Sequence, residues 1–236
     1  MTMPTGCTLN RLAEIPVFAT LDRAQLRHLV HQSQILACER GESVFEAGQP
    51  CEGLHAVLDG FIKVYARTSD GHEKVIDVVG RGHTLPGTHL VRTEPHGHHA
   101  RALADTHVLI VPHAVLRAEL YLDLEMATRL LDDAARQVRR MMRDIETTSL
   151  CSATQRVCDY LLHLPTLAEH GTREGGDGPD ERIVNLPVSK GVVASLLSIT
   201  PEHFSRIMRE LQTEGLIEMQ QRTIRLLAPH RLALRR

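Results

Sequence analysis

The sequence lacks the features that would place a protein in a membrane or outside the cell. No apolar run approaches the ~20 residues of a membrane-spanning helix. The N-terminus has no charged segment followed by an apolar one, as a secretory signal peptide would. The cysteines are scattered and odd in number, which is atypical of a disulfide framework. These absences predict a cytoplasmic protein with reduced thiols and no membrane contact. The five cysteines are Cys7, Cys38, Cys51, Cys151 and Cys158.

Signatures of common enzyme classes are also missing. There is no strand-elbow nucleophile and no phosphate-binding glycine loop, and no pair of acids stands in a recognisable catalytic motif. His96 and His98 lie in a strand-rich region and leave open a cupin-like metalloenzyme, in which two histidines, a glutamate and a distant histidine hold one metal. No glutamate follows them, because residues 100–104 are Ala-Arg-Ala-Leu-Ala. We therefore expect no enzymatic activity; metal content with turnover would support the cupin alternative.

Residues 188–212 contain the pattern of two short helices joined by a tight turn. Ser189 is placed to cap a helix over about 190–197, and Thr200 to cap a second helix that begins at Pro201. Apolar residues recur at helical spacing in both, so each helix would bury one stripe. This is the pattern of a helix-turn-helix, although an ordinary helical hairpin with a solvated polar face would share it.

A predicted β-hairpin follows the second helix. Gly215 is placed to end that helix, and the apolar runs 216–219 and 223–227 flank Gln220-Gln221-Arg222. Such a hairpin is the wing of a winged helix, although its turn lacks the usual Gly or Asn. The motif predicts double-stranded DNA as a partner. The side chains placed to contact it are Ser189, Lys190, Thr200, Glu202, His203, Ser205, Arg206, Arg209 and Arg222.

The charge of the chain is unevenly distributed. The formal net charge is −2 over 236 residues. Residues 183–236 carry eight Lys/Arg against four Glu, a net charge of +4, which leaves −6 for the remainder. A basic module on an acidic body suits phosphate binding, because each neutralised phosphate releases counterions. The excess of positive charge is small, so a dimer that presents two such modules would bind DNA better.

The first half of the chain is predicted to be β-rich, after short helices within 12–31. Short apolar runs alternate with glycines, and Asp59-Gly60 and Asp70-Gly71 are hairpin signals. We expect a β-roll of the jelly-roll type over residues 1–114, like a cyclic-nucleotide-binding domain. With a winged helix over 150–236, the fold class is α+β. Residues 165–181 are predicted to be a flexible surface loop.

Residues 115–149 are predicted to form a dimerisation helix. From 115 to 148 there is no Gly or Pro, which allows one helix of about 50 Å. Apolar residues there repeat with heptad spacing, as in a parallel two-stranded coiled coil. We expect a homodimer; the alternative is that the helix packs on its own domain. The seam positions are Leu124, Ala127, Leu131, Ala134, Val138, Met141, Ile145 and Thr148.

A β-roll, a long dimer helix and a winged helix, in this order, resemble the CRP/FNR superfamily of bacterial transcription regulators. Arg40-Gly41-Glu42 and the stretch 58–65 look like its β-roll signature, and residues 192–208 resemble the DNR-type branch, which responds to nitric oxide. The resemblance implies a palindrome of TTGAT-like half-sites read by Glu202, Ser205 and Arg206, with RNA polymerase as a further partner. The chemistry is suitable, since arginine can donate twice to guanine and glutamate can accept from cytosine.

Each effector known in this superfamily needs particular residues, and their presence or absence narrows the choice of effector for this chain. In members that bind cyclic nucleotides, a Gly-Glu pair and a later arginine hold the ribose and phosphate. Here Thr88 and His99 stand at those positions, which disfavours a cyclic nucleotide, although Arg101 could supply an anion contact. An iron–sulfur cluster, as in the FNR branch, needs four well-placed thiolates. Cys7 has no partner cysteine within five residues, so we exclude a cluster.

Haem is the cofactor that the DNR-type resemblance implies. The chain has fifteen histidines, seven of which fall between residues 83 and 113, and imidazole is a good haem and transition-metal ligand. These histidines could equally be solvated loop residues, or could sense zinc, copper or nickel directly, so the metal is left open. The candidate cofactor ligands are His83, His89, His96, His98 and His99.

Overall fold

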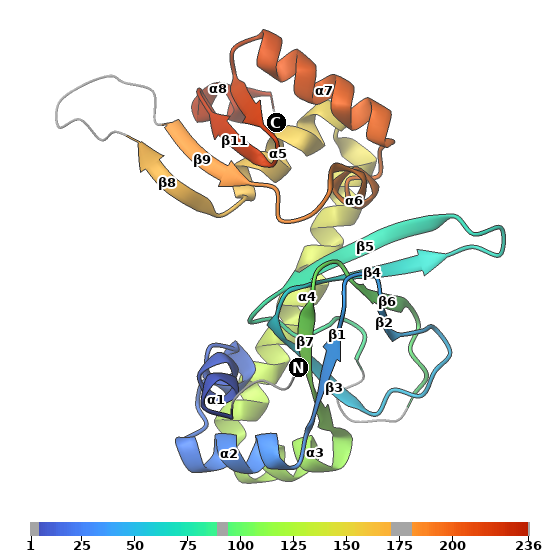
Figure 1. The fold of residues 1–236 in the computed structure, drawn as a ribbon, viewed down its shortest axis with the longest axis vertical. Coiled ribbons are helices and arrows are strands. Elements are labelled where there is room, and N and C mark those ends of the chain that lie inside the picture. The colour runs from blue at the N-terminus through green and yellow to red at the C-terminus, as the bar shows by residue number, and fades with distance from the viewer. Residues whose placement is uncertain (1–4, 89–93, 171–180, 236) are drawn as a thin grey trace. The chain divides into compact units, whose positions relative to one another are not determined.

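The structure, a computed structural model, describes residues 5–88, 94–170 and 181–235 (Figure 1). The chain divides into two compact units, Met1–Arg140 and Met141–Arg236. Within the described ranges, no helix is both long and apolar enough to cross a membrane.

The first unit begins with short helices, as predicted, and continues as a β-roll. Asp22 caps the second helix by accepting hydrogen bonds from the amides of Ala24 and Gln25. Seven strands then form two antiparallel sheets, with orders β1-β7-β3 and β2-β6-β4-β5. The elements are α1 (Thr5–Ala13), η1 (Pro16–Phe18), α2 (Arg23–His31), β1 (Gln34–Cys38), β2 (Ser43–Phe45), β3 (Gly53–Asp59), β4 (Phe61–Arg67), β5 (Glu73–Gly80), β6 (His99–Ala102) and β7 (Thr106–Pro112).

Two apolar clusters hold this unit together. One lies between the two sheets, where Val57 and Val108 of the three-stranded sheet meet Ile62, Val64 and other residues of the four-stranded sheet. The other joins the outer face of the three-stranded sheet to the N-terminal helices and to α3 (His113–Leu122), which lie together at one end of the β-roll (Figure 1). The three-stranded sheet is therefore covered on both faces, which explains why β3 is buried along nearly its whole length.

The two Asp-Gly pairs behave differently. Asp70-Gly71 turns β4 into its hydrogen-bonded partner β5, which confirms the predicted hairpin. The hairpin predicted at Asp59-Gly60 is wrong, because β3 and β4 belong to different sheets. Gly60 turns the corner with φ +85°, and a Cβ there would lie 2.3 Å from the Thr106 hydroxyl. This close approach, rather than hairpin geometry, requires glycine.

The long helix begins later than predicted. α4 spans Leu124–Leu150, about 40 Å at 1.5 Å per residue, and α3 is a separate helix. Asp123 separates them with an extended backbone, φ −129°. Its carboxylate accepts from the amides of Glu125 and Met126 at 2.9 and 3.0 Å, as an N-cap does. A single helix through residues 115–148 is therefore wrong, whereas the heptad segment from Leu124 is helical throughout.

The second unit contains the helix-turn-helix and a four-stranded sheet of order β10-β11-β9-β8. Residues 166–170 of the predicted loop form an edge strand instead, while residues 171–180 lie outside the described residues. The predicted α+β class, with β-roll, long helix and winged helix-turn-helix, is confirmed. The elements are α5 (Ala153–His163), β8 (Thr166–His170), β9 (Glu181–Asn185), α6 (Lys190–Leu196), α7 (Pro201–Thr213), β10 (Ile217–Gln220), β11 (Thr223–Leu226) and α8 (Pro229–Leu234).

Candidate nucleic-acid interface and sensor site

The helix-turn-helix forms where its caps predict it. The Ser189 hydroxyl accepts from the Val192 amide at 3.5 Å, and the Thr200 hydroxyl accepts from the His203 amide at 3.2 Å. Between the helices, Ser198 has φ 56°, the left-handed conformation that closes the turn. α7 buries its whole predicted stripe, Phe204, Ile207, Met208 and Leu211. In α6 only Val193 of the predicted stripe is buried, while Leu196 and Leu197 are half-buried.

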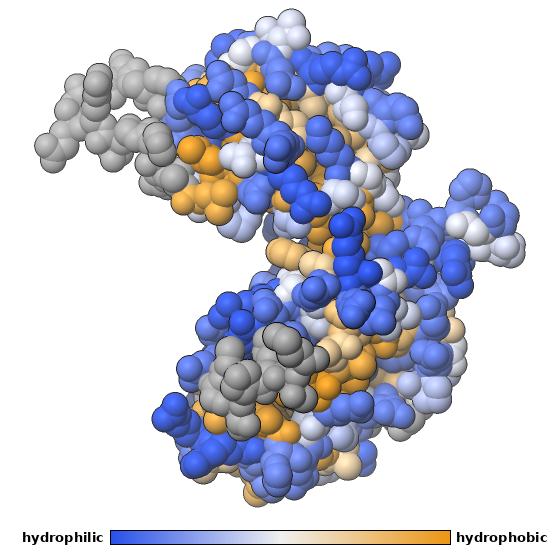
Figure 2. All heavy atoms as spheres, viewed as in Figure 1, coloured by the Kyte–Doolittle hydropathy of each residue, from blue (hydrophilic) through white to orange (hydrophobic). Residues whose placement is uncertain are grey.

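The opposite face of α7 is polar and accessible. Figure 2 shows largely hydrophilic side chains over the outer side of this helix. Glu202, Arg206 and Arg209 are exposed there, whereas His203 and Ser205 are half-buried. Ser205 donates its hydroxyl to the Pro201 carbonyl at 2.8 Å, so its oxygen is left as an acceptor. The sequence prediction omitted Glu210, which shares this face and pairs with Arg206.

The wing supplies a second exposed edge. Its tip holds Gln221, with φ 54°, and the exposed Arg222. Arg225 lies on β11, three residues after Arg222. It donates to Glu218 of β10 at 2.7 Å and to Glu181 of β9 at 2.9 Å. This arginine therefore links three strands of the wing sheet. Of the other predicted contact residues, Ser189, Lys190 and Thr200 are also exposed.

The seam predicted on α4 is largely exposed in the single chain. Leu124, Leu131 and Ile145 are 82%, 71% and 67% exposed, and Val138 and Met141 are also exposed. Ala127 and Ala134 are half-buried. A different stripe of α4, which begins with Met126 and Leu130, packs against its own β-roll. The seam residues therefore form an apolar stripe that the single chain does not cover, as at an association surface.

Two of the sensor-region histidines are packed into the β-roll. His96 stacks on Phe45 with ring centroids 3.6 Å apart, and His55, which the sequence prediction did not single out, meets both rings edge-on. His55 Nδ1 donates to the Gly53 carbonyl at 2.9 Å. Burial lowers the pKa of His55 to about 4, because the charged imidazolium would lose its hydration. These rings serve as core side chains.

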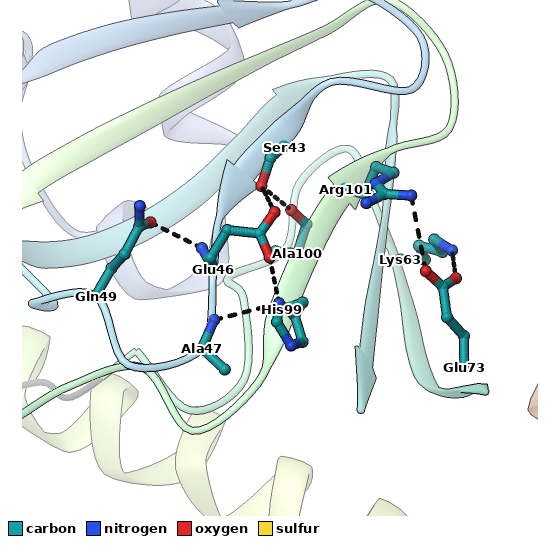
Figure 3. Close-up of polar contacts among 9 residues, drawn as sticks. All are labelled: Ser43, Glu46, Ala47, Gln49, Lys63, Glu73, His99, Ala100 and Arg101. Carbon is teal, nitrogen blue, oxygen red and sulfur yellow. Dashed lines mark hydrogen bonds and ion pairs between the residues drawn. The ribbon is translucent and has the colours of Figure 1, made fainter. Parts of the chain in front are cut away.

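His99 lies in a separate polar network on the outer face of the four-stranded sheet (Figure 3). It contacts the carboxylate of Glu46, which also accepts from the Ser43 hydroxyl at 2.7 Å. The Ser43 hydrogen bond, followed by that of His99, lowers the pKa of Glu46. Arg101 shares this outer face and lies 3.7 Å from Glu73, whereas Ala100 and Ala102 point inward. Arg101 therefore does not face the interior, where it would have to lie to replace a missing phosphate ligand.

The predicted cofactor ligands do not meet at one place. His83 and His98 are exposed, His96 is in the core, His99 faces outward, and His89 lies outside the described residues. Within those residues, no group of three or more His, Cys, Asp or Glu side chains could hold a metal ion. The predicted ligands are therefore spread over separate places rather than gathered in one cluster.

The residues at the cyclic-nucleotide positions are committed to internal contacts. Thr88 is buried and donates its hydroxyl to the Leu85 carbonyl at 2.8 Å. His99 contacts an acidic partner, Glu46, which would repel a phosphate.

Two family models match the chain, one in each half. The cyclic nucleotide-binding domain matches residues 35–120, and the Crp-like helix-turn-helix domain matches residues 155–235. The chain belongs to the CRP/FNR family of transcription regulators. The curated relatives of this CRP/FNR protein include transcription regulators that match over most of its length. The CRP-like cAMP-activated global transcriptional regulator of Mycobacterium tuberculosis is 23% identical over 224 residues, covering 95% of this chain and 97% of that protein.

Another relative, electron transport regulator A of Shewanella oneidensis, is 24% identical and covers 83% of this chain and 76% of its own length. Among solved structures, FixK2 of Bradyrhizobium japonicum matches with a TM-score of 0.70 and 23% identity over 86% of this chain and 96% of that one. The c-di-GMP responsive regulator CLP of Xanthomonas campestris matches with a TM-score of 0.63 and 20% identity, covering 88% and 99%. At these identities the structural likeness shows the fold alone.

Proposed function

We propose that this CRP/FNR-family regulator acts as a homodimer that reads a palindrome of TTGAT-like half-sites. Sensing is assigned to residues 1–114, dimerisation to 115–149 and DNA binding to 150–236. The observation that carries the proposal is the exposed polar face of α7 beside an exposed wing tip, in a chain that also exposes an apolar stripe on α4. A two-fold dimer through that stripe would present two reading helices to two half-sites.

Each predicted DNA-contact residue has a role that its chemistry supports. Arg206 donates two hydrogen bonds to a guanine, and Glu202 accepts from a cytosine amino group. Ser205 accepts through the oxygen that its hydrogen bond to Pro201 leaves free. Lys190, Arg209 and the wing-tip Arg222 contact phosphates, while Ser189, Thr200 and His203 border the groove. Without a base partner, Glu202 would be repelled by the phosphates, so its exposed position favours base reading.

The test of DNA recognition uses the full-length protein and three duplexes. The first carries two TTGAT half-sites as an inverted repeat with centres about one helical turn apart. The second has the guanine of each half-site replaced, and the third is scrambled. We expect at least ten-fold tighter binding to the first, at the same salt concentration. Equal affinity for all three would contradict the proposed site. RNA polymerase, the further partner expected, is tested by its co-binding on the first duplex.

Nitric oxide sensing through haem is the effector response that the resemblance of residues 192–208 supports. Because the described histidines lie in separate places, we assign no axial ligand. The test is a visible spectrum of haem-reconstituted, anaerobic protein before and after nitric oxide, with unbound haem removed. A saturable Soret band that shifts with the gas is the expected result. If haem washes away, the effector is of another class, and divalent metals and cyclic nucleotides are titrated next.

A further inference from the structure

A cavity lies where the end of α4 meets the start of α5, and none of the predicted DNA-contact residues lines it. Its volume is about 370 Å³, which is within the range of pockets that hold small molecules. All of its lining residues belong to the second unit. They include Arg143, Glu146, Thr147 and Leu150 of α4 and Gln155 and Asp159 of α5.

Four hydrogen bonds hold the connection between the two helices. Ser152 caps α5 by accepting from the Gln155 amide at 3.3 Å, and the Gln155 side chain accepts from the Ser152 amide at 2.7 Å. Arg156 Nη1 donates to the Thr148 carbonyl at 3.3 Å and to the Cys151 carbonyl at 2.8 Å, so it ties α5 to the end of α4. The walls of the cavity are therefore in place before a ligand binds, which lowers the cost of binding one.

The α4 wall of the cavity faces away from the predicted dimer seam. The four α4 residues of the lining occur at positions i, i+3, i+4 and i+7, so they share one face of the helix. In the heptad that places Ile145 in the seam, these residues take b, c and f positions, on the opposite side. The proposed dimer would therefore leave the cavity accessible.

Two lining side chains present hydrogen-bond donors. Arg143 is exposed and forms no salt bridge with another residue that the structure describes. The capping box engages the side-chain oxygen of Gln155, so the NH2 group of that amide, which carries two donors, is not used by the box. A guanidinium and an amide NH2 suit a carboxylate, because its two oxygens accept several hydrogen bonds.

Two carboxylates line the same cavity. Glu146 is exposed, and no salt bridge joins it to the rest of the described chain. The Asp159 side chain is 21% exposed, and its Oδ2 lies 3.6 Å from His163 Nδ1, which is too long for a hydrogen bond. With one positive and two negative side chains, the lining has a formal charge of −1. Leu150, which is 83% exposed, adds an apolar surface.

These groups together define the ligand that would match the cavity. Charge complementarity requires one anionic and two cationic groups, for a net charge of +1. The apolar surface of Leu150 suits an aliphatic stem that carries a charge at its end. A basic α-amino acid, with a carboxylate, an α-ammonium and a cationic side chain on an aliphatic stem, has all of these features.

We propose that this cavity is a binding site for a basic α-amino acid. Arg143 and Gln155 hold the ligand's carboxylate, and Glu146 and Asp159 hold its two cationic groups. The site lies in the second unit and is distinct from the effector site assigned to residues 1–114. The inference goes beyond the proposed function and does not rest on it, because it requires neither DNA nor a particular effector.

Titration calorimetry of the full-length protein with L-lysine, at low ionic strength, tests the site. Three analogues each lack one charged group: cadaverine lacks the carboxylate, 6-aminohexanoate the α-ammonium and L-norleucine the ε-ammonium. We expect L-lysine to bind saturably, one per chain, and every analogue to bind at least three-fold more weakly, because each leaves a lining group unpaired. The absence of saturable L-lysine binding, or an analogue that binds as tightly, overturns the proposal.

Variants then assign the charged groups of lysine to individual side chains. Arg143→Gln should weaken L-lysine binding at least three-fold but should not weaken cadaverine binding, since cadaverine has no carboxylate. Glu146→Gln should also weaken L-lysine binding, and should leave unchanged the affinity for whichever analogue lacks the ammonium that Glu146 contacts. Arg143 and Glu146 are exposed, so an unchanged far-UV circular dichroism spectrum is expected for both variants.

Two matched variants control for a general effect of charge. Arg139→Gln and Asp132→Asn change exposed α4 residues that do not line the cavity, and should leave L-lysine binding as in the wild type. The proposal is overturned if these controls weaken L-lysine binding as much as the lining variants do. It is also overturned if Arg143→Gln weakens cadaverine and L-lysine binding equally.

Hydrogen–deuterium exchange locates the bound ligand. Saturating L-lysine should slow amide exchange several-fold in residues 143–159, because the ligand contacts both helices, and should leave the β-roll strands unchanged. Protection confined to the β-roll would place the ligand elsewhere and overturn the proposal. DNA binding is measured separately: failure of the protein to bind any of the three duplexes would contradict the recognition site and leave the lysine results as they stand.

Discussion

Arg206 and Glu210 lie one helical turn apart on the exposed side of α7, with Arg206 Nε 3.8 Å from Glu210 Oε1. Their side chains are 67% and 55% exposed. An exposed pair of this spacing contributes only about 0.3–0.5 kcal/mol. A guanine that accepts two hydrogen bonds from Arg206 would compete successfully with this pair. The relationship leads to separate predictions for its two members.

Replacing Arg206 by alanine should weaken binding to the palindrome by about 1–3 kcal/mol and relax the preference for one guanine in each half-site. The free energy of unfolding should change little, because the side chain is exposed. A gel-shift titration on the intact and guanine-substituted duplexes measures the effect. Arg231→Ala, on α8, is the control and should lack the sequence-specific loss. Equal losses for Arg206→Ala on specific and scrambled DNA would refute base reading.

Replacing Glu210 by glutamine should strengthen binding to all duplexes. The change removes a negative charge from the face that approaches the phosphates, so the gain should shrink as the salt concentration rises. The comparison is made at two salt concentrations, with Glu125→Gln on α4 as the charge-matched control. Weaker binding to the palindrome alone would mean instead that Glu210 helps to position Arg206.

Placing a charge in the α4 seam should dissociate the dimer. Val138 is 56% exposed in the single chain, so Val138→Glu need not disturb the fold of one protomer. In a seam it would place two carboxylates against each other in an apolar surface, which is costly. Analytical ultracentrifugation should show a monomer, with Arg139→Glu at the adjacent exposed position as a dimeric control. A Val138→Glu protein that stays dimeric would place the interface elsewhere.

The buried His55 should make the protein less stable in mild acid. Its pKa is about 4, below the ordinary value of 6.5, because burial penalises the charged ring. Between these values the unfolded chain binds a proton that the folded protein does not. The stabilisation is therefore complete above pH 6.5 and is lost as the pH falls towards 4, by up to about 3 kcal/mol.

Denaturant unfolding at pH 7 and pH 4.5 checks this dependence. His55→Asn keeps a side-chain donor for the Gly53 carbonyl but cannot titrate, so the difference between the two pH values should shrink. His72→Asn removes an imidazole that is 86% exposed and should leave the dependence unchanged. If His55→Asn has the wild-type pH dependence, other groups must account for the acid sensitivity.

Two glycines of the second unit should respond oppositely to alanine. Gly215 ends α7 with φ +65°, where a Cβ is strained, so Gly215→Ala should lower stability by about 1 kcal/mol. Gly191 lies inside α6 without a positive φ, and a Cβ added there would meet no atom within 4 Å. Gly191→Ala should raise stability by roughly 0.5–1 kcal/mol through helix propensity. Thermal unfolding of both variants measures the contrast, and a shift of the same sign in both would contradict the backbone argument.

Local sequence patterns predicted the elements that are determined by residues close together in the chain. Ser189 and Thr200 cap the helices that they were expected to cap, and the residues around Gln221 form the expected turn despite its unusual composition. The break at Asp123 was missed, although an aspartate directly before Leu124-Glu125 is an N-cap signal. Its position inside a long run without Gly or Pro concealed it.

In the histidine-rich region, by contrast, closeness in the sequence did not mean closeness in space. Sequence proximity suggested one cluster, but strand alternation puts His99 on the outer face of β6, while His96 packs on Phe45. The hydrogen bond between Thr84 and Asp133 could not be anticipated either, because the two residues are 49 positions apart in the chain. No local pattern reports which loop a helix will contact.

The sequence alone determined the helix-turn-helix, the apolar seam and the β-rich first half, because caps, heptad spacing and glycine-marked turns act over a few residues. The tertiary structure decided which side chains share a site, because that depends on which sheet each strand joins and which face each residue occupies. Asp59-Gly60 illustrates the limit: the local signal was a turn, and only the packing of two sheets made it a corner between them.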